Sequence, residues 1–343
     1  MSSTDTQLSG FFLDGAARYQ EMGEDYQELW RSLSRASEGG KRFRPALLAG
    51  IYAELGGADA DLASHVGAAV ELLHTAFVIH DDVIDGDDVR RGRLNVSGTF
   101  DQRARALGAG CERARVLGTT AGILAGDLAL VGAVRMIALT GADPRTTRRL
   151  LDLLDHAVRV TAAGELADVR FSLDLEPVSL GDIITMEEHK TAVYSFVLPL
   201  QAGAVLAGAP ERLVSGLGEL GRLVGIAFQL LDDVQGVFGD ETETGKSALT
   251  DLREGKVTPL IAHARSTASW GDIAPFVGDP TLTESRAAIV RDLLVVCGSR
   301  SFIEDLAASY VEAALGLADR LELPPGFISW VTTITDDLAR RAA

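Results

Sequence analysis

Cysteine and histidine are scarce in this chain, which limits the chemistry it can perform. Its 343 residues include two cysteines, Cys111 and Cys297, and six histidines. Two cysteines cannot build a disulfide framework, and such scarcity suits a reducing compartment, so we expect a cytoplasmic protein. The cysteines and histidines also lack the spacing of zinc ligands, so no zinc site is expected.

Positive charge is also in short supply. The chain has 32 lysines and arginines against 49 aspartates and glutamates, which gives a formal net charge of −17. Proteins that bind nucleic acid present a basic surface, and anionic membrane surfaces attract basic segments. The composition therefore argues against both kinds of partner.

No membrane-spanning segment stands out in the sequence. The most membrane-like run, residues 118–141, contains Asp127 and Arg135, and the chain starts with polar and acidic residues. A spanning helix needs about 20 predominantly apolar residues, and a signal peptide needs an apolar region near its start. We expect no signal peptide and no integral membrane segment, and we interpret residues 118–141 as a buried helix.

Sustained strand alternation is missing too, and apolar residues instead recur every three or four positions. The helices that this period predicts cover residues 46–55, 63–83, 113–139, 145–173, 184–206 and 212–238, several of them apolar nearly all round. Breaks fall near residues 56–57, 91–102, 141–144, 208–210 and 239–255. Shorter helices are expected after residue 256. Since no linker or repeat is visible, we predict an all-α fold with one domain over residues 1–343.

Two aspartate clusters stand at the ends of long apolar stretches: residues 80–85, which read HDDVID, and Asp232-Asp233. Asp81 and Asp85 are four residues apart, so on a helix they share one face and repel each other. Mg²⁺ prefers oxygen ligands and is often held by one or two carboxylates plus substrate phosphates. One such motif alone is more often a solvated helix end. Two of them raise the prospect of a diphosphate bound through metal ions.

Short basic sets lie near both aspartate clusters. They are Lys41-Arg42-Phe43-Arg44, Arg90-Arg91, Lys190, Lys246 and Lys256. Arginine binds phosphate oxygens as a planar fork and lysine binds them as a point charge. Any one set alone is more often ordinary surface charge. Their placement in an acidic chain predicts two anionic substrates, one bridged by metal and one held by cations.

Together these motifs resemble the trans-type isoprenyl diphosphate synthases (polyprenyl synthetases), most closely the bacterial geranylgeranyl diphosphate synthases. The matching motifs, in chain order, are GGKRFRP at residues 39–45, ELLH at 71–74, the aspartate motif at 81–85, RRG at 90–92, KT at 190–191, FQ at 228–229 and DD at 232–233. The resemblance implies a large single-domain bundle of about ten or more helices around a central active-site cavity, of the isoprenoid synthase type. It also implies a homodimer, the commonest oligomeric form.

The reaction implied by the resemblance is Mg²⁺-dependent head-to-tail condensation of isopentenyl diphosphate with an allylic diphosphate. About three ions would act with substrate bound, as Lewis acids and as a template. Their implied ligands are Asp81, Asp85 and Asp232, with Asp82 and Asp233 in support. Departure of pyrophosphate would leave an allylic cation, which the alkene of isopentenyl diphosphate attacks.

The resemblance assigns further roles to polar and basic residues. The residues implied to neutralise the allylic diphosphate are Arg90, Lys190 and Lys256. The residues implied to hold isopentenyl diphosphate through cations alone are Lys41, Arg44, His74 and Arg91. Thr191 and Gln229 are implied to stabilise the cation by their dipoles, and Lys246 to close over the site and exclude water.

Product length is implied by residues one helical turn before Asp81. Small Ala76 leaves room beyond the shortest products, and the bulky ring of Phe77 could form the floor of a hydrophobic tunnel. We therefore favour geranylgeranyl diphosphate as the product, with farnesyl diphosphate second. Ordinary core packing is the competing interpretation of Phe77.

The second motif departs from the family pattern. Gly236 stands where the last aspartate of a full DDxxD motif belongs, and Asp240 lies four residues further on. The first aspartate, which is the principal metal contact in the family, is present as Asp232. The resemblance therefore implies retained activity, with the affinity for the metal ion at this motif left open.

Several other residues are assigned structural roles. Arg42 is expected to be solvated, Tyr194 to pack in the core, and His80 to be a satisfied core histidine. Gly126-Asp127 and Gly164-Glu165 are expected to serve helix packing.

Two other function classes remain open. A class I terpene cyclase shares the helical bundle, but it normally has an asparagine in its second metal motif, and the only asparagine here, Asn95, follows the first motif. A cyclase also has no use for Lys41, Arg44 and Arg91. A non-catalytic subunit of a heteromeric synthase usually loses aspartates, whereas this chain retains five in its two clusters.

Overall fold

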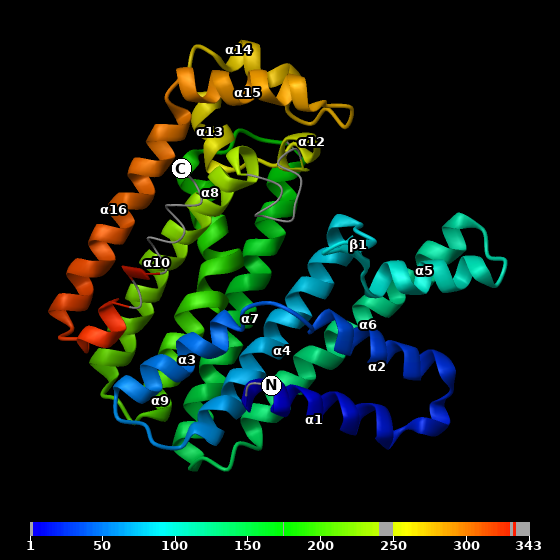
Figure 1. The fold of residues 1–343 in the computed structure, drawn as a ribbon, viewed down its shortest axis with the longest axis vertical. Helices are drawn as coiled ribbons and strands as arrows, with labels where there is room; N and C mark the ends of the chain where they lie inside the picture. The colour runs from blue at the N-terminus through cyan, green and yellow to red at the C-terminus, as the bar shows by residue number, and fades with distance from the viewer. Residues whose placement is uncertain (1–2, 174, 240–249, 330–331, 334–343) are drawn as a thin grey trace. The chain divides into compact units, whose positions relative to one another are not determined.

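The computed structural model describes residues 3–173, 175–239, 250–329 and 332–333, and Figure 1 traces their fold. The described residues form fifteen α-helices and two very short strands, which confirms the all-α prediction. Contacts divide the chain into two compact units, Met1–Leu154 with Ala202–Ala209, and Asp155–Gln201 with Pro210–Ala343. The expectation of one domain over residues 1–343 stays a prediction.

The first unit is built around two long helices. Its elements are α1 (Ser3–Arg18), η1 (Gln20–Met22), α2 (Glu24–Ala36), α3 (Phe43–Glu54), α4 (Ala60–Asp85), β1 (Val89–Arg90), β2 (Arg93–Leu94), α5 (Val96–Ala106), α6 (Cys111–Ala138) and the first part of α7 (Pro144–Ser172). α4 packs along α6, α1 and α3 lie against α4, and α5 lies against α6. The two strands form an antiparallel hairpin in which Val89 pairs with Leu94.

Helix α4 carries the first aspartate motif at its C-terminal end. The Asp59 side chain caps its start by accepting a hydrogen bond from the Leu62 backbone N–H at 2.9 Å. Gly86, with φ of 74°, ends it in the left-handed conformation that suits glycine. Glycines of α6 allow this end of α4 to approach closely. A Cβ at Gly122 would lie 2.3 Å from Val83, and one at Gly126 would lie 2.1 Å from the His80 ring.

Helix α6 differs from a fully buried helix. Glycine and alanine form its buried stripe, but Val116, Val131 and Val134 on its other face are 65%, 63% and 43% exposed. The expectation of a buried helix was therefore wrong for this second face of α6. By length and composition alone, α4, α6 and α10 (Glu211–Phe238) could each cross a membrane. The share of their most apolar windows buried inside the protein is 67%, 50% and 61% respectively.

The second unit surrounds α10. Its other elements are the rest of α7, α8 (Leu180–Glu187), η2 (Glu188–Val197), the start of α9 (Leu198–Leu206), α12 (Thr250–Glu254), α13 (Pro259–Arg265), α14 (Trp270–Ile273), η3 (Ala274–Phe276), α15 (Glu284–Val296) and α16 (Ser299–Arg320). α10 packs on α16 and on η2. Leu230, Ile261 and Ile303 are among the buried side chains of the core that this packing creates.

Two helix boundaries differ from the sequence-based expectations. The predicted break at residues 91–102 ends early, because Asn95 accepts a hydrogen bond from the Gly98 backbone N–H at 2.8 Å and starts α5 at Val96. The predicted helix over residues 184–206 is interrupted by η2, a ten-residue π-helical segment that contains Lys190 and Thr191. Segments of π-helix occur mostly as short bulges, and frequently at functional sites.

Candidate functional site

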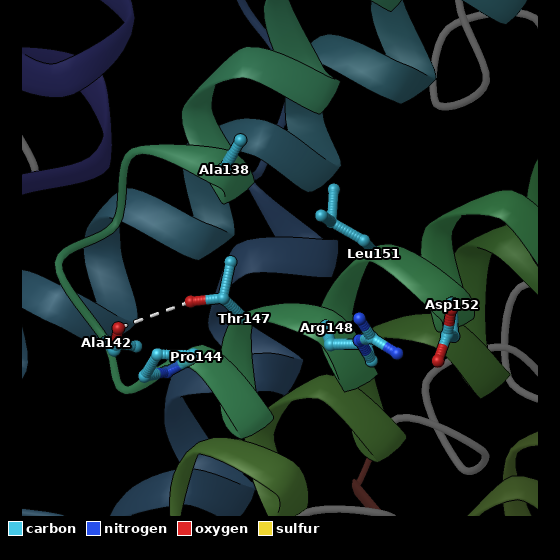
Figure 2. A pocket seen from close by; sticks show the side chains of 7 residues that line it. All are labelled: Ala138, Ala142, Pro144, Thr147, Arg148, Leu151 and Asp152. Atoms are coloured by element: carbon cyan, nitrogen blue, oxygen red, sulfur yellow. Dashed lines mark hydrogen bonds between the residues drawn. The ribbon is translucent and has the colours of Figure 1, made fainter.

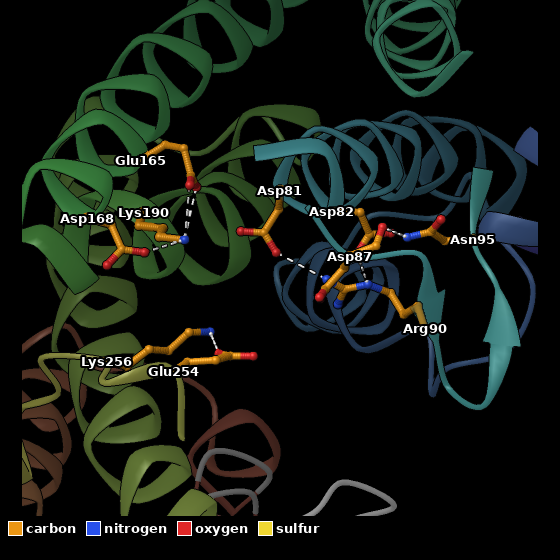
Figure 3. A network of polar contacts seen from close by, with 10 residues as sticks. All are labelled: Asp81, Asp82, Asp87, Arg90, Asn95, Glu165, Asp168, Lys190, Glu254 and Lys256. Carbon is orange, nitrogen blue, oxygen red and sulfur yellow. Dashed lines mark hydrogen bonds and ion pairs between the residues drawn. The ribbon is translucent and has the colours of Figure 1, made fainter. Parts of the chain in front are cut away.

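The first aspartate motif occupies the last turns of α4, where an arginine from the following hairpin forms hydrogen bonds with it (Figure 3). Arg90 Nε donates to Asp82 Oδ1 at 2.6 Å, and its Nη2 donates to Asp81 Oδ2 at 3.1 Å. Asp82 is buried, whereas Asp81 is half-buried and Asp85 is exposed. Burial raises the pKa of Asp82 to about 6, against the opposing effect of Arg90. Asp81 and Asp85 are therefore the carboxylates of this motif that solvent reaches most readily.

Two arginines of the predicted isopentenyl diphosphate set, Arg44 and Arg91, lie near His74 in the first unit. Burial lowers the pKa of His74 well below its usual value, and Arg44, Arg91, Arg90 and Arg42 lower it further. The imidazole is therefore neutral at pH 7 and lies within electrostatic reach of four guanidinium groups. Such a concentration of positive charge suits an anionic ligand.

Arg91 joins this group to the glycine pair ahead of Lys41. Its Nη1 donates to the Glu38 carbonyl oxygen at 3.2 Å. A Cβ at Gly39 would lie 3.2 Å from the same nitrogen, so the missing side chain makes room for the guanidinium. Gly39 and Gly40 have φ of 78° and 80°, a backbone conformation that favours glycine. Residues 39–44 and 90–91, about 50 positions apart, thus meet in one place.

Arg42 corrects an expectation. Its side chain is 19% exposed rather than solvated, and it forms ion pairs with Asp5 of α1 at 2.8 Å and Glu71 of α4 at 2.9 Å. The spacing of the basic motif carries no information about either partner, since both come from other helices.

In the second unit, Lys190 is held by two carboxylates of α7. Its Nζ lies 2.6 Å from Asp168 and 3.1 Å from Glu165, as the left part of Figure 3 shows. Gly164 packs directly against the backbone of the same π-helical segment, with a hypothetical Cβ 2.3 Å from Lys190 N. The packing roles expected for Gly126 and Gly164 are confirmed. Glu165 does more than pack, because it forms an ion pair with Lys190, and a carboxylate oxygen of Asp127 lies 3.6 Å from His80 Nε2.

The second aspartate motif lies on α10 beside a buried glutamate of α8. Asp232 is exposed and Asp233 is buried. Burial raises the pKa of Glu187 well above its usual value, and the charge of Asp233 and a hydrogen bond with it add to the shift. This shift favours the protonated form of Glu187, which is hydrogen-bonded to Asp233. Asp240 lies outside the described residues.

The remaining predicted residues have the following surroundings. Lys256 Nζ lies 3.4 Å from a Glu254 carboxylate oxygen, and Thr191 and Gln229 are partly exposed. Ala76 is fully buried, and Phe77 is partly exposed on the same helix. Tyr194 is buried, as expected. Lys246 lies outside the described residues.

The donors of the two motifs fit a hard divalent cation. Carboxylate oxygens are the ligands Mg²⁺ prefers, and Asp81 and Asp85 lie one turn apart on α4. Among the described residues, no three histidine, cysteine or acidic side chains gather as a self-sufficient metal site. Mg²⁺ usually completes its coordination with water and substrate phosphates.

A separate pocket of about 450 Å³ lies at the turn between α6 and α7 (Figure 2). Its lining includes Pro144, Thr147, Arg148 and Asp152, and it contains none of the predicted site residues. It is therefore separate from both aspartate motifs.

Sequence reasoning missed the acidic partners of the basic residues. The partners are Asp5, Glu71, Glu165 and Asp168. Glu187, the buried neighbour of Asp233, was missed as well. Glu187 left a signal in the sequence, since it stands beside Met186 and four residues after Ile183, on the buried side of α8.

Comparisons with known proteins agree with this chemistry. A family described as polyprenyl synthetase matches residues 27–275. The geranylgeranyl diphosphate synthase of Methanosarcina mazei is 33% identical over 274 residues, which cover 80% of this chain and 78% of that protein. The geranylfarnesyl diphosphate synthase of Aeropyrum pernix is 33% identical over 294 residues, 84% of this chain and 86% of that protein. A solved structure of the Corynebacterium glutamicum geranylgeranyl pyrophosphate synthase, complexed with isoprenyl diphosphate and magnesium, has a TM-score of 0.89 at 27% identity and covers 98% of this chain and 97% of that one.

Proposed function

The chain belongs to the polyprenyl synthetase family, and we propose that it makes geranylgeranyl diphosphate. It is a prenyltransferase that condenses isopentenyl diphosphate with allylic diphosphates. One observation on α4 carries the assignment of the two substrates. The helix ends in Asp81 and Asp85, and His74, about two turns earlier, is surrounded by guanidinium groups. Carboxylates suit a diphosphate bound through metal, and guanidinium groups suit one bound directly.

For the allylic diphosphate we propose Mg²⁺ held by Asp81, Asp85 and Asp232. When bound, the metal supplies Lewis acidity that stabilises pyrophosphate as it leaves. Asp82 is buried and tied to Arg90, so its role is to orient the end of α4 rather than to bind the ion. The structure of the Corynebacterium protein contains magnesium and isoprenyl diphosphate, which supports the choice of metal.

The second unit supplies the groups proposed to control the reacting carbons. Glu165 and Asp168 hold the Lys190 ammonium, which would neutralise diphosphate charge together with Lys256. Thr191 follows Lys190 in η2, and we assign its hydroxyl to stabilisation of the allylic cation by its dipole, with Gln229 of α10 in the same role. The departing pyrophosphate is the proposed acceptor of the final proton.

We propose that two residues of α4 determine the product length. Phe77 lies one turn before Asp81 and is partly exposed, so its ring is available to limit a growing chain. Ala76 beside it is small. Two relatives of equal identity carry names with different products, geranylgeranyl and geranylfarnesyl diphosphate. For this reason we base the twenty-carbon proposal on Phe77, with farnesyl diphosphate as the alternative.

The exposed apolar face of α6 supports a homodimer. Val116, Leu124, Val131 and Val134 are between 43% and 65% exposed along one helix. Apolar patches of this kind on a soluble protein commonly mark interfaces. A two-fold axis would let α6 of one copy cover α6 of the other.

The test is an assay of the purified chain with labelled isopentenyl diphosphate and, in turn, dimethylallyl, geranyl and farnesyl diphosphate. Products are dephosphorylated and sized, with Mg²⁺ present or removed by a chelator. A twenty-carbon alcohol from all three primers, lost on chelation, is the expected result. A fifteen-carbon end point would leave the synthase assignment standing and change the proposed product to farnesyl diphosphate. No consumption of isopentenyl diphosphate would refute the synthase and favour a partner-dependent subunit or a cyclase.

A further inference from the structure

Arg42 bridges three segments of the first unit. Its Nε donates to Asp5 Oδ1 of α1 at 2.8 Å, and its Nη1 donates to Glu71 Oε1 of α4 at 2.9 Å. Arg42 itself lies at the start of α3, directly between Lys41 and Phe43 and two residues before Arg44. A single guanidinium therefore fastens the basic motif to two other helices.

The backbone conformation of Arg42 explains why these ion pairs matter for the loop before α3. Arg42 has φ of 49° and ψ of 40°, a left-handed conformation that residues with a side chain rarely keep unless their surroundings hold it. The preceding Gly39 and Gly40 also have positive φ and carry no side chains that could anchor them. The side chain of Arg42 therefore helps to hold the loop before α3, together with the contact of Arg91 with Glu38.

The partner on α4 makes the contact hard to replace. Glu71 is 6% exposed, and its Oε2 is buried with no hydrogen-bond partner among the described residues. A buried carboxylate is stable only when a cation compensates it. Burial alone would lower the pKa of Arg42, but the hydrogen bonds to Asp5 and Glu71 raise it above its usual value. Glu71 also lies one turn before His74, so the same pair sets the distance between the basic motif and that histidine.

We propose that Arg42 is a positioning residue for isopentenyl diphosphate, which holds Lys41 and Arg44 in place beside His74 through its ion pairs with Glu71 and Asp5. The inference rests on the proposed function, because it takes Lys41, Arg44 and His74 as the group that binds this substrate. Arg42 does not touch the substrate in this role. Its loss therefore weakens the binding of one substrate and leaves the allylic site, which begins about three turns after Glu71 on α4, nearly unchanged.

The test is calorimetric titration of isopentenyl diphosphate into the metal-free full chain, followed by steady-state kinetics with each substrate varied. The variants are Arg42→Met, Arg42→Lys and Asp5→Asn. Arg103→Met is the matched control, since Arg103 also joins two helices of this unit by ion pairs, with Asp25 at 2.8 Å and Glu24 at 3.6 Å. Both of these partners belong to α2, away from the basic motif.

Arg42→Met should weaken isopentenyl diphosphate binding, and raise its KM, by about ten- to hundredfold, because misplacement by about 1 Å can cost that much. KM for the allylic substrate should change by less than about twofold, as should every parameter of Arg103→Met. Arg42→Lys should recover only part of the loss, since an ammonium lacks the planar fork that reaches two carboxylates. Asp5→Asn keeps the buried Glu71 pair and should give a smaller loss.

An Arg42→Met protein that melts earlier but binds isopentenyl diphosphate like the wild type would overturn the inference and leave the proposed function standing. Should that variant not fold, Arg42→Lys and Asp5→Asn decide, and unchanged affinity in both refutes the positioning role. A wild-type chain that does not bind isopentenyl diphosphate refutes the proposed function, and the inference falls with it.

Discussion

Replacement of Gly164 by alanine sets two physical effects against each other. In the middle of a helix such as α7, alanine is intrinsically better than glycine by about 1 kcal/mol. A Cβ at this position, however, would lie 2.3 Å from Lys190 N and 2.7 Å from His189 C. These are backbone atoms, which cannot move aside as a side-chain tip can, so α7 and η2 would have to separate by about 1 Å to reach ordinary contact.

The packing effect should dominate. Overpacking costs about 1–3 kcal/mol, so Gly164→Ala should lower the free energy of unfolding in spite of its better helix propensity. The displaced segment carries Lys190 and Thr191, and a shift of about 1 Å at such groups can reduce kcat about a hundredfold. Denaturant unfolding and turnover under saturating substrates measure the two effects.

Gly50 provides the matched control. It lies in the exposed face of α3, and a Cβ there would meet no atom within 4 Å. Gly50→Ala should therefore stabilise the protein by about 0.5–1 kcal/mol and leave kcat unchanged. If Gly164→Ala stabilised the protein as Gly50→Ala does, or kept its full kcat, the close approach of α7 to η2 would be wrong.

Four further outcomes are expected. Phe77→Ala should lengthen the product, and an unchanged product spectrum would remove Phe77 as the floor of the tunnel. Folding lowers the pKa of His74 below 6.5, so the unfolded chain binds more protons and the free energy of unfolding falls as the pH decreases below 6.5. In unfolding titrations, His74→Gln should remove up to about 1.4 kcal/mol of this fall per pH unit. Above pH 7 the variant should show no such pH-dependent difference. Asn95→Ala removes the cap of α5 and should cost about 1 kcal/mol in denaturant unfolding, where no loss would contradict the cap. Val131→Asp should convert the proposed dimer to a monomer in sedimentation analysis, whereas Val296→Asp, at an 81% exposed position of the second unit, should not; a Val131→Asp dimer would exclude this face of α6 as the interface.

Local signals in the sequence accounted for most of the helices. The period of three and four in apolar residues predicted α6 and α10 to within a few residues, because burial of one face depends on neighbours along the same helix. The π-helical form of residues 188–197 had no such signal. This segment packs closely against Gly164 of another helix, a contact that no local pattern records.

The sequence by itself determined the chemical groups of the candidate site: two aspartate motifs, the basic sets beside them, and the helices that carry them. Side-chain type and spacing along one helix are local properties, so the four-residue spacing of Asp81 and Asp85 was enough to assign them to one face. Only the tertiary structure decided which carboxylate compensates which cation. Arg42 pairs with Glu71, 29 positions away in the sequence, and Lys190 pairs with Asp168, 22 positions away. In both pairs the partner lies on a separate helix. Both pairs are at least partly buried, and no sequence motif records that burial. It distinguishes these charged residues, which shape the site, from charged residues on the solvent-exposed surface.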